Sequence, residues 1–317
     1  MNPTTTPLAS NRPPVSKTRS LLKAMYKHKY LYLLGLPGIL LFIVFKYVPM
    51  YGILIAFQDY NPFVGMAKSE WVWFEHFQKL FTDPDFFMIL RNAFVISLFG
   101  VITFPAPIIL ALLLNEVRNQ LFKRSIQTVI YLPHFISWVI VVSLTYLFLS
   151  TEVGLINKLI AAWGGEKIAF LFKPEYFYPL IVGQDLWRGI GWGSIIYMAA
   201  IAGVDPALYE AAKMDGAGKF RQIWHVTIPC IMPTIIILFI LQLGNMLDVN
   251  FEQMWLMQNP FNTHLSEVFE TYVYKVGIGG AEYSYTTAVG IFKSVVGLVL
   301  ILLANYLARK RGHEGIW

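Results

Sequence analysis

Six stretches of mostly apolar residues alternate along the chain with segments that carry nearly all of its charge. A helix needs roughly 20 mostly apolar residues to cross the hydrocarbon core of a bilayer. The fourth stretch is the weakest, because Asp185 and Arg188 interrupt it. The pattern predicts an all-α membrane protein with six transmembrane helices, at about residues 30–57, 88–114, 126–149, 178–202, 231–254 and 285–308.

Composition supports this prediction and removes several classes of protein. Apolar residues make up 56% of the chain and charged residues only 14%, whereas a soluble domain carries about 25% charged residues. Cys230 is the single cysteine, so no intrachain disulfide can form. The chain lacks the Gly-x-x-x-x-Gly-Lys-Ser/Thr loop that cradles phosphates, and its histidines and carboxylates show no zinc spacing. We therefore expect no ATP, metal or other cofactor to bind this chain itself.

The distribution of lysine and arginine predicts the orientation in the membrane. Basic clusters fall at residues 12–29, 118–124, 213–221 and 309–311, and most acidic residues fall in the other connections. Cytosolic segments carry the excess of basic residues, so both termini are predicted to be cytosolic. The predicted parts are a disordered basic tail (1–29), a transmembrane domain (30–308) and a cytosolic C-terminal tail (309–317). Topology also accounts for the basic clusters, so nucleic-acid binding is not expected.

The fourth connection, residues 203–230, carries signals for a helix that lies outside the bilayer. Asp205 suits the N-cap and Pro206 the first helical position. Gly216 can adopt the positive φ that ends a helix. A second amphipathic turn is predicted at about 219–226, and Pro229 is expected to stop it before the fifth span. A short, stiff helix of this kind suits docking on another protein.

Within this connection, Glu-Ala-Ala is followed after three residues by glycine and then, after nine more, by Val-x-Ile-Pro. This spacing resembles the EAA loop of bacterial ABC importer permeases, whose pattern ends in Ile-x-Leu-Pro. The resemblance implies a type I importer permease fold in which residues 203–230, here called the coupling loop, dock on the ATPase subunits. The residues assigned to this role are Glu210, Ala211, Ala212, Asp215, Gly216 and Pro229.

Other stretches, among them residues 47–63, 244–253 and 288–294, are similar to carbohydrate-uptake permeases of the maltose-transporter type, closest to the polysaccharide and oligosaccharide branch of Gram-positive bacteria. The resemblance implies an oligosaccharide cargo and no enzymatic activity in this chain. It also implies the partners: a second, different permease subunit, ATPase subunits that bind the ATP, and membrane lipid. An extracytoplasmic sugar-binding protein would deliver cargo to loops near 58–88 and 151–178.

Polar residues inside the apolar stretches are candidates for the substrate path, because they are costly in a bilayer unless they face a cavity or a partner. Gln242, Asn245 and Asp248 follow one another at i, i+3 and i+6 and would share a helix face. Asn250 and Trp187 complete the candidate set. The alternative is that these groups pair with neighbouring helices. Asp185 and Arg188 are expected to pair with each other, and Lys46, Glu252 and Lys293 to reach the interface from span ends.

Two other functions stay open from the residues alone. An ion-coupled secondary transporter could use Asp185 and Asp248 as proton or cation sites, although no inverted repeat is evident. An ABC importer permease for a non-sugar solute would carry the same loop. Dependence of transport on ATP or on the ion gradient separates the first alternative from an importer.

Overall fold

A computed structural model describes residues 26–312, 315 and 316. Most of the predicted tail, residues 1–25, lies outside the described part. The described residues divide into two compact units, with the boundary between Leu54 and Ile55. The first contains α2 (Lys29–Phe42), the π-helical turn η1 (Ile43–Tyr47) and α3 (Val48–Met50). Pro49 is the second residue after η1, and the wider π turn accommodates a proline ring that would strain a regular helix.

The second unit begins within η2 (Tyr51–Phe57), a 3₁₀ helix, and continues as a short antiparallel ribbon. In this ribbon, β1 (Gln58–Asp59) pairs with β2 (Glu70–Trp71), Gln58 opposite Trp71. After α4 (Glu75–Thr82) comes one long apolar helix, Phe86–Glu116. It consists of α5 (Phe86–Thr103) and α6 (Pro105–Glu116), with Pro105 at the junction.

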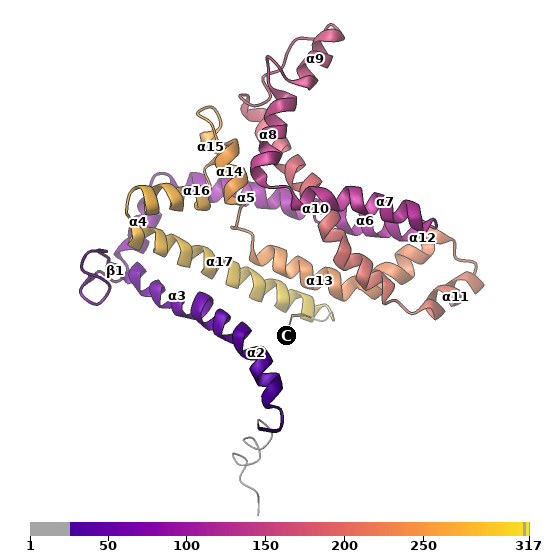
Figure 1. Ribbon diagram of the computed structural model, residues 1–317, viewed down its shortest axis with the longest axis horizontal. Helices are drawn as coiled ribbons and strands as arrows, with labels where there is room; N and C mark the ends of the chain where they lie inside the picture. The colour runs from indigo at the N-terminus through magenta and orange to yellow at the C-terminus, as the bar shows by residue number, and fades with distance from the viewer. Residues whose placement is uncertain (1–25, 313–314, 317) are drawn as a thin grey trace, which may run out of the picture. The chain divides into compact units, whose positions relative to one another are not determined.

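The middle of the chain contains two sharp bends (Figure 1). Helix α7 (Gln120–Tyr131) and η3 (Leu132–Phe135) are followed by α8 (Trp138–Leu149) at 101° to them. Then come α9 (Leu155–Ala162), η4 (Pro174–Tyr176) and the 26-residue α10 (Phe177–Ala202). Helix α11 (Pro206–Met214) departs from α10 by 71°. Gly191 allows α10 to pack closely on α7, since a Cβ there would lie 2.2 Å from the Ile130 carbonyl oxygen.

The last third forms two long helices with a helical insertion between them. Helix α12 (Lys219–Gln222), the π turn η5 (Ile223–Thr227) and α13 (Ile228–Gly244) run on without a break. The insertion contains α14 (Phe251–Met257), α15 (Thr263–Ser266), α16 (Phe269–Val273) and the π turn η6 (Tyr274–Gly279). Helix α17 (Tyr283–Lys310) follows and lies against α13 (Figure 1).

Within the described residues, four helices are long and apolar enough to cross a membrane, and the count reaches six if each bent pair is one span. All six predicted stretches fall on helical segments. The fifth was wrong at its C-terminal end: 231–254 was predicted, but α13 ends at Gly244 and α14 is separate. At this end α13 packs closely on α17, since a Cβ on Gly297 would lie 2.5 Å from the Gly244 carbonyl oxygen.

Two buried clusters hold the second unit together. The larger joins α5, α10, α14, α16 and α17 around Ile89, Ile181, Met254, Phe269 and Tyr285, all almost fully buried. The smaller joins α6, α10 and α13 through Ala111, Tyr197, Ile201 and Ile231. The coupling loop connects α10 to α13, so both of its ends continue into helices of the smaller cluster.

Candidate functional site

The coupling loop begins with the predicted N-cap. Asp205 accepts a hydrogen bond on Oδ1 from the Ala207 backbone N–H at 2.9 Å, and Pro206 occupies the first helical position of α11. A cap of this type contributes about 0.5–2 kcal/mol to helix stability, because it satisfies a backbone donor left free at the helix start. The helix therefore begins at a fixed residue immediately after the bend from α10.

The predicted helix stop is confirmed at Gly216, which has a φ of 73°. The Ala217 N–H donates to the Ala212 carbonyl at 2.8 Å, and the Gly216 N–H donates to the Lys213 carbonyl at 3.0 Å. This pair of bonds is a Schellman motif, which requires a left-handed residue at the position of Gly216. The Gln222 side-chain amide then donates to the Ala217 carbonyl at 2.8 Å and closes the turn.

The loop presents both charge and apolar surface. No residue of α11 is buried, and Glu210 and Ala211 are exposed while Ala212 is half-buried. Sequence reasoning missed the large apolar residues that accompany them. They are exposed by 45 to 88%, and they are Leu208, Met214, Phe220 and Trp224. The available signal was their presence in a connection otherwise rich in charge, since apolar side chains on a water-facing loop indicate a partner surface.

The sequence predicted that Pro229 stops a helix, and this prediction was wrong. The chain passes from α12 through η5 into α13 as one helix, with Pro229 in the first turn of α13. The reason is the π turn, whose i to i+5 spacing accommodates a residue that lacks an N–H donor. The coupling loop is therefore continuous in backbone with the fifth apolar stretch. A displacement of its second half reaches α13 directly.

The early end of α13 separates the candidate path residues from one another. Asn245 is the C-cap of α13, and its side-chain amide donates to the Leu241 carbonyl at 3.1 Å. The expected stripe of Gln242, Asn245 and Asp248 on one helix face is therefore wrong, because Asp248 lies in the turn that follows.

Asn245 and Asp248 nevertheless share a pocket of about 310 Å³ with Lys293 and Ser294 of α17. Lys293 lies in the interior of α17 rather than at its end, so the expectation that it reaches the interface was wrong. Its Nζ is 2.7 Å from Asp248 Oδ1 and also pairs with Glu270 of α16. The side chains of Lys293 and Glu270 are only 15% and 18% exposed. A lysine held between two carboxylates therefore joins three elements at this pocket.

Gln242 lines a different pocket, of about 400 Å³, together with Asp185 of α10. The expected pair of Asp185 with Arg188 is not among the ion pairs of the described residues. Arg188 instead donates from Nε to the Ile136 carbonyl at 3.1 Å and lies over the Trp138 ring at 4.7 Å. In the described part of the chain Asp185 therefore lines this pocket without the direct ion pair to Arg188 that the sequence suggested.

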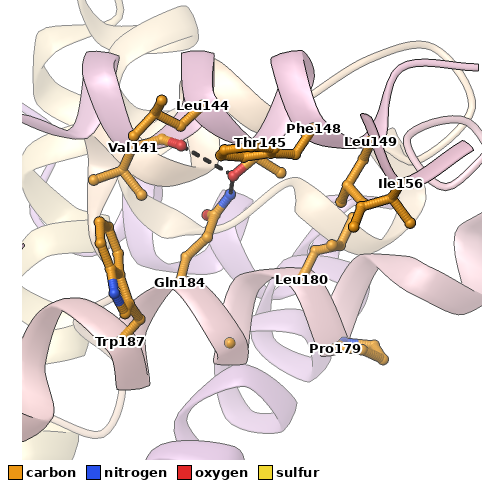
Figure 2. Close-up of a pocket in the computed structure, with 11 residues that line it drawn as sticks. Val141, Leu144, Thr145, Phe148, Leu149, Ile156, Pro179, Leu180, Gln184 and Trp187 are labelled. Carbon is orange, nitrogen blue, oxygen red and sulfur yellow. Dashed lines mark hydrogen bonds between the residues drawn. The ribbon is translucent and has the colours of Figure 1, made fainter. Parts of the chain in front are cut away.

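The structure does not bring Trp187 and Asn250 to either polar pocket. Trp187 lines an apolar pocket of about 440 Å³ between α8 and α10 (Figure 2). In that pocket the Gln184 side-chain amide donates to Thr145 Oγ1 at 2.7 Å. Asn250 caps α14, accepting from the Gln253 N–H at 2.9 Å. Local backbone chemistry thus accounts for Asn250.

Asp83 lies in the loop before α5 and joins this loop to α16 and α17. Its Oδ2 accepts hydrogen bonds from Tyr272 at 2.5 Å and from Tyr285 at 2.8 Å. Burial raises the pKa of Asp83, but the bonds from Tyr272, the Asp85 N–H and Tyr285 outweigh it and leave the pKa below its ordinary value of 3.8. Burial and the bond to Asp83 raise the pKa of Tyr272 to about 12. Near neutral pH Asp83 is therefore ionised and Tyr272 is neutral, so the hydrogen bond between them has a charged acceptor and a neutral donor.

Comparison with known proteins decides which class of transporter carries this loop and these pockets. The family described as binding-protein-dependent transport system inner membrane component matches residues 103–313, which include the whole coupling loop and every lining residue of these two pockets except Gly100. The chain belongs to this family. It is therefore an inner-membrane permease component of a binding-protein-dependent transport system, and the ion-coupled alternative is set aside.

Relatives match over nearly the full length. The chain is 55% identical over 302 residues to the polygalacturonan/rhamnogalacturonan transport system permease protein YteP of Bacillus subtilis, covering 95% of this chain and 94% of YteP. It is 54% identical to protein LplB of the same organism, covering 94% of each. Among solved structures, it resembles a chain of the bacterial alginate ABC transporter in complex with alginate pentasaccharide-bound periplasmic protein. The TM-score is 0.84 at 39% identity, with 93% of this chain and 99% of that chain covered.

Proposed function

We propose that this permease imports oligosaccharides as one of two different permease subunits, and that ATPase subunits drive it by docking on the coupling loop. The ATP is bound by those subunits. In this arrangement both termini and the loop lie in the cytosol, and an extracytoplasmic sugar-binding protein approaches the loops near 58–88 and 151–178. Relatives whose names include polygalacturonan, rhamnogalacturonan and alginate favour a sugar over another solute.

The geometry of α11 is the observation that supports docking most directly. The helix is capped at its start, stopped by Gly216, inclined by 71° to α10 and free of buried residues. Exposed Met214 and Phe220 flank the stop, and Glu210 provides a charge for a cationic partner side chain. A short helix with one apolar patch and one acidic residue fits a groove on a soluble subunit.

Charge reversal at Glu210 tests this docking. The tagged chain is co-expressed with its ATPase subunit, and the amount of ATPase retained per permease is measured. We expect Glu210→Arg to reduce retention at least about tenfold, because it replaces a charge-assisted contact by like-charge repulsion. Glu166→Arg makes the same change on an exposed residue before η4 and should retain the ATPase as the unaltered chain does. Equal retention by both variants would refute docking at Glu210.

The proposed substrate path includes Gln242, Asn245 and Asp248, because each lines a pocket between apolar helices that also contains an ionisable side chain. We expect Asn245→Ala and Asp248→Ala to lower sugar uptake by roughly five- to tenfold, the loss of one hydrogen bond to a sugar hydroxyl. The assembled complex and its basal ATP hydrolysis should persist. Gln127→Ala, outside both pockets, serves as the control. Unchanged uptake in the first two variants would remove these residues from the path.

A further inference from the structure

The coupling loop is attached to all three helices of the smaller core. Its first half continues from α10, and its second half continues through η5 into α13. A third attachment reaches α6, where Lys219 Nζ lies 2.9 Å from Glu116 Oε2. The cytosolic parts of α6, α10 and α13 form one packed body through Ala111, Ile201 and Ile231. A partner that moves α11 can therefore act on this body by several routes.

The turn between the two halves of the loop is its most deformable part. Gly216 and Gly218 flank Ala217, and a Cβ on either glycine would meet no atom within 4 Å. Backbone with two glycines and open space around it bends easily. If the turn were the only connection, a push on α11 would fold the loop instead of moving α13.

One hydrogen bond bypasses this turn. The Tyr209 hydroxyl of α11 lies 2.9 Å from the Thr227 hydroxyl, the last residue of η5. Thr227 is 2% exposed and Tyr209 is half-buried. Tyr209 immediately precedes Glu210, so the bond begins beside the residue proposed to meet the ATPase. The bond ends at Thr227, which is also the N-cap of α13 and lies two residues before Pro229.

We propose that the Tyr209–Thr227 hydroxyl pair transmits the displacement of α11 to α13, which makes both members positioning residues for transport. This inference rests on the proposed docking of the ATPase. The ion pair of Lys219 with Glu116 is the weaker route, because its side chains are 60% and 33% exposed and water screens the attraction. The hydroxyl pair is shielded from water on the Thr227 side, which strengthens its hydrogen bond.

Cys230 offers a direct measurement of this transmission. It is the single cysteine of the chain, it is exposed, and it lies in the first turn of α13, three residues after Thr227. An environment-sensitive fluorophore is attached to Cys230, and the chain is assembled with cysteine-free ATPase subunits. The fluorescence change on adding ATP and vanadate then reports the movement of α13, and the retained ATPase reports docking.

We expect Tyr209→Phe and Thr227→Val each to reduce the ATP-induced change about fivefold, the equilibrium effect of one hydrogen bond. Both substitutions keep the shape of the side chain, and docking of the ATPase should be unaffected. The double variant should respond no less than either single variant, because one bond is lost in all three. Lys219→Met, which removes the exposed ion pair, should change the response less than twofold.

Three results would overturn the proposal. The first is an unchanged response in both single variants, and the second is a double variant whose loss equals the product of the single losses. The third is a complex of the unaltered chain that retains ATPase but shows no response at Cys230, which means that α13 does not move with the docked subunits. A chain that retains no ATPase refutes the docking itself, and this inference falls with it.

Discussion

Replacing Gly216 by valine is expected to reduce transport at least about tenfold. Gly216 has a φ of 73°, where a β-branched residue is strained by roughly 1–3 kcal/mol. The chain can relieve that strain only by giving up the Schellman motif that ends α11. The backbone after α11 would then take another direction, and the apolar side chains of Met214 and Phe220 would no longer lie on either side of one helix end. Sugar uptake in whole cells and retention of the ATPase by the purified permease measure the effect.

Gly218 provides a matched control two residues away. It has a φ of −69° and a ψ of 169°, values that any residue adopts. Neither glycine has an atom within 4 Å of where a Cβ would lie, so the Cβ of a valine causes no collision at either site. Gly218→Val should therefore leave uptake within about twofold, because only backbone conformation separates the two positions. Equal uptake by the two valine variants would show that the left-handed conformation at Gly216 is not needed for function.

The features of the coupling loop that depend on local chemistry could be predicted from sequence. Asp205, Pro206 and Gly216 act on backbone groups within a few residues, so their effect hardly depends on the rest of the fold. The six apolar stretches were likewise visible, because a membrane span requires a long run of apolar residues. Pro229 was misjudged by the same local reasoning, since a proline signals a helix stop unless a π turn precedes it.

The membrane pockets could not be predicted because they depend on contacts between distant residues. The end of α13 lies where Gly244 closely approaches Gly297 of α17, a contact that helical periodicity cannot indicate. Arg188 contacts the Ile136 carbonyl and the Trp138 ring instead of pairing with Asp185, three residues before it. Asn245 and Asp248 line one pocket, although they do not share the helix face on which the spacing argument relied. Lys293 was expected to reach the interface instead of pairing with Asp248 and Glu270, although its interior position in an apolar helix was the available signal.

Replacing Lys293 by methionine should be among the most destabilising single changes in this permease. Methionine keeps the length and apolar stem of the side chain but leaves the carboxylate of Glu270, only 18% exposed, without its cation. Removing one member of a buried ion pair costs about 3–5 kcal/mol, because the other charge stays desolvated. We expect the temperature at which half of the purified protein loses its monodisperse elution peak to fall by about 6 °C or more. Lys213→Met, on the exposed face of α11, should leave it unchanged.

A second variant separates the effect of charge from that of lost packing. In the Lys293→Met/Glu270→Gln double variant neither buried charge remains, and Asp248, with 61% of its side chain exposed, is solvated by water. Because a buried pair can often be replaced as a whole at little cost, the double variant should recover most of the lost thermal stability. A double variant no more stable than Lys293→Met would mean that packing around the lysine stem, and not the unpaired carboxylate, determines the stability of this junction. Recovery of stability without recovery of uptake would show that the ion pair between α16 and α17 also serves transport.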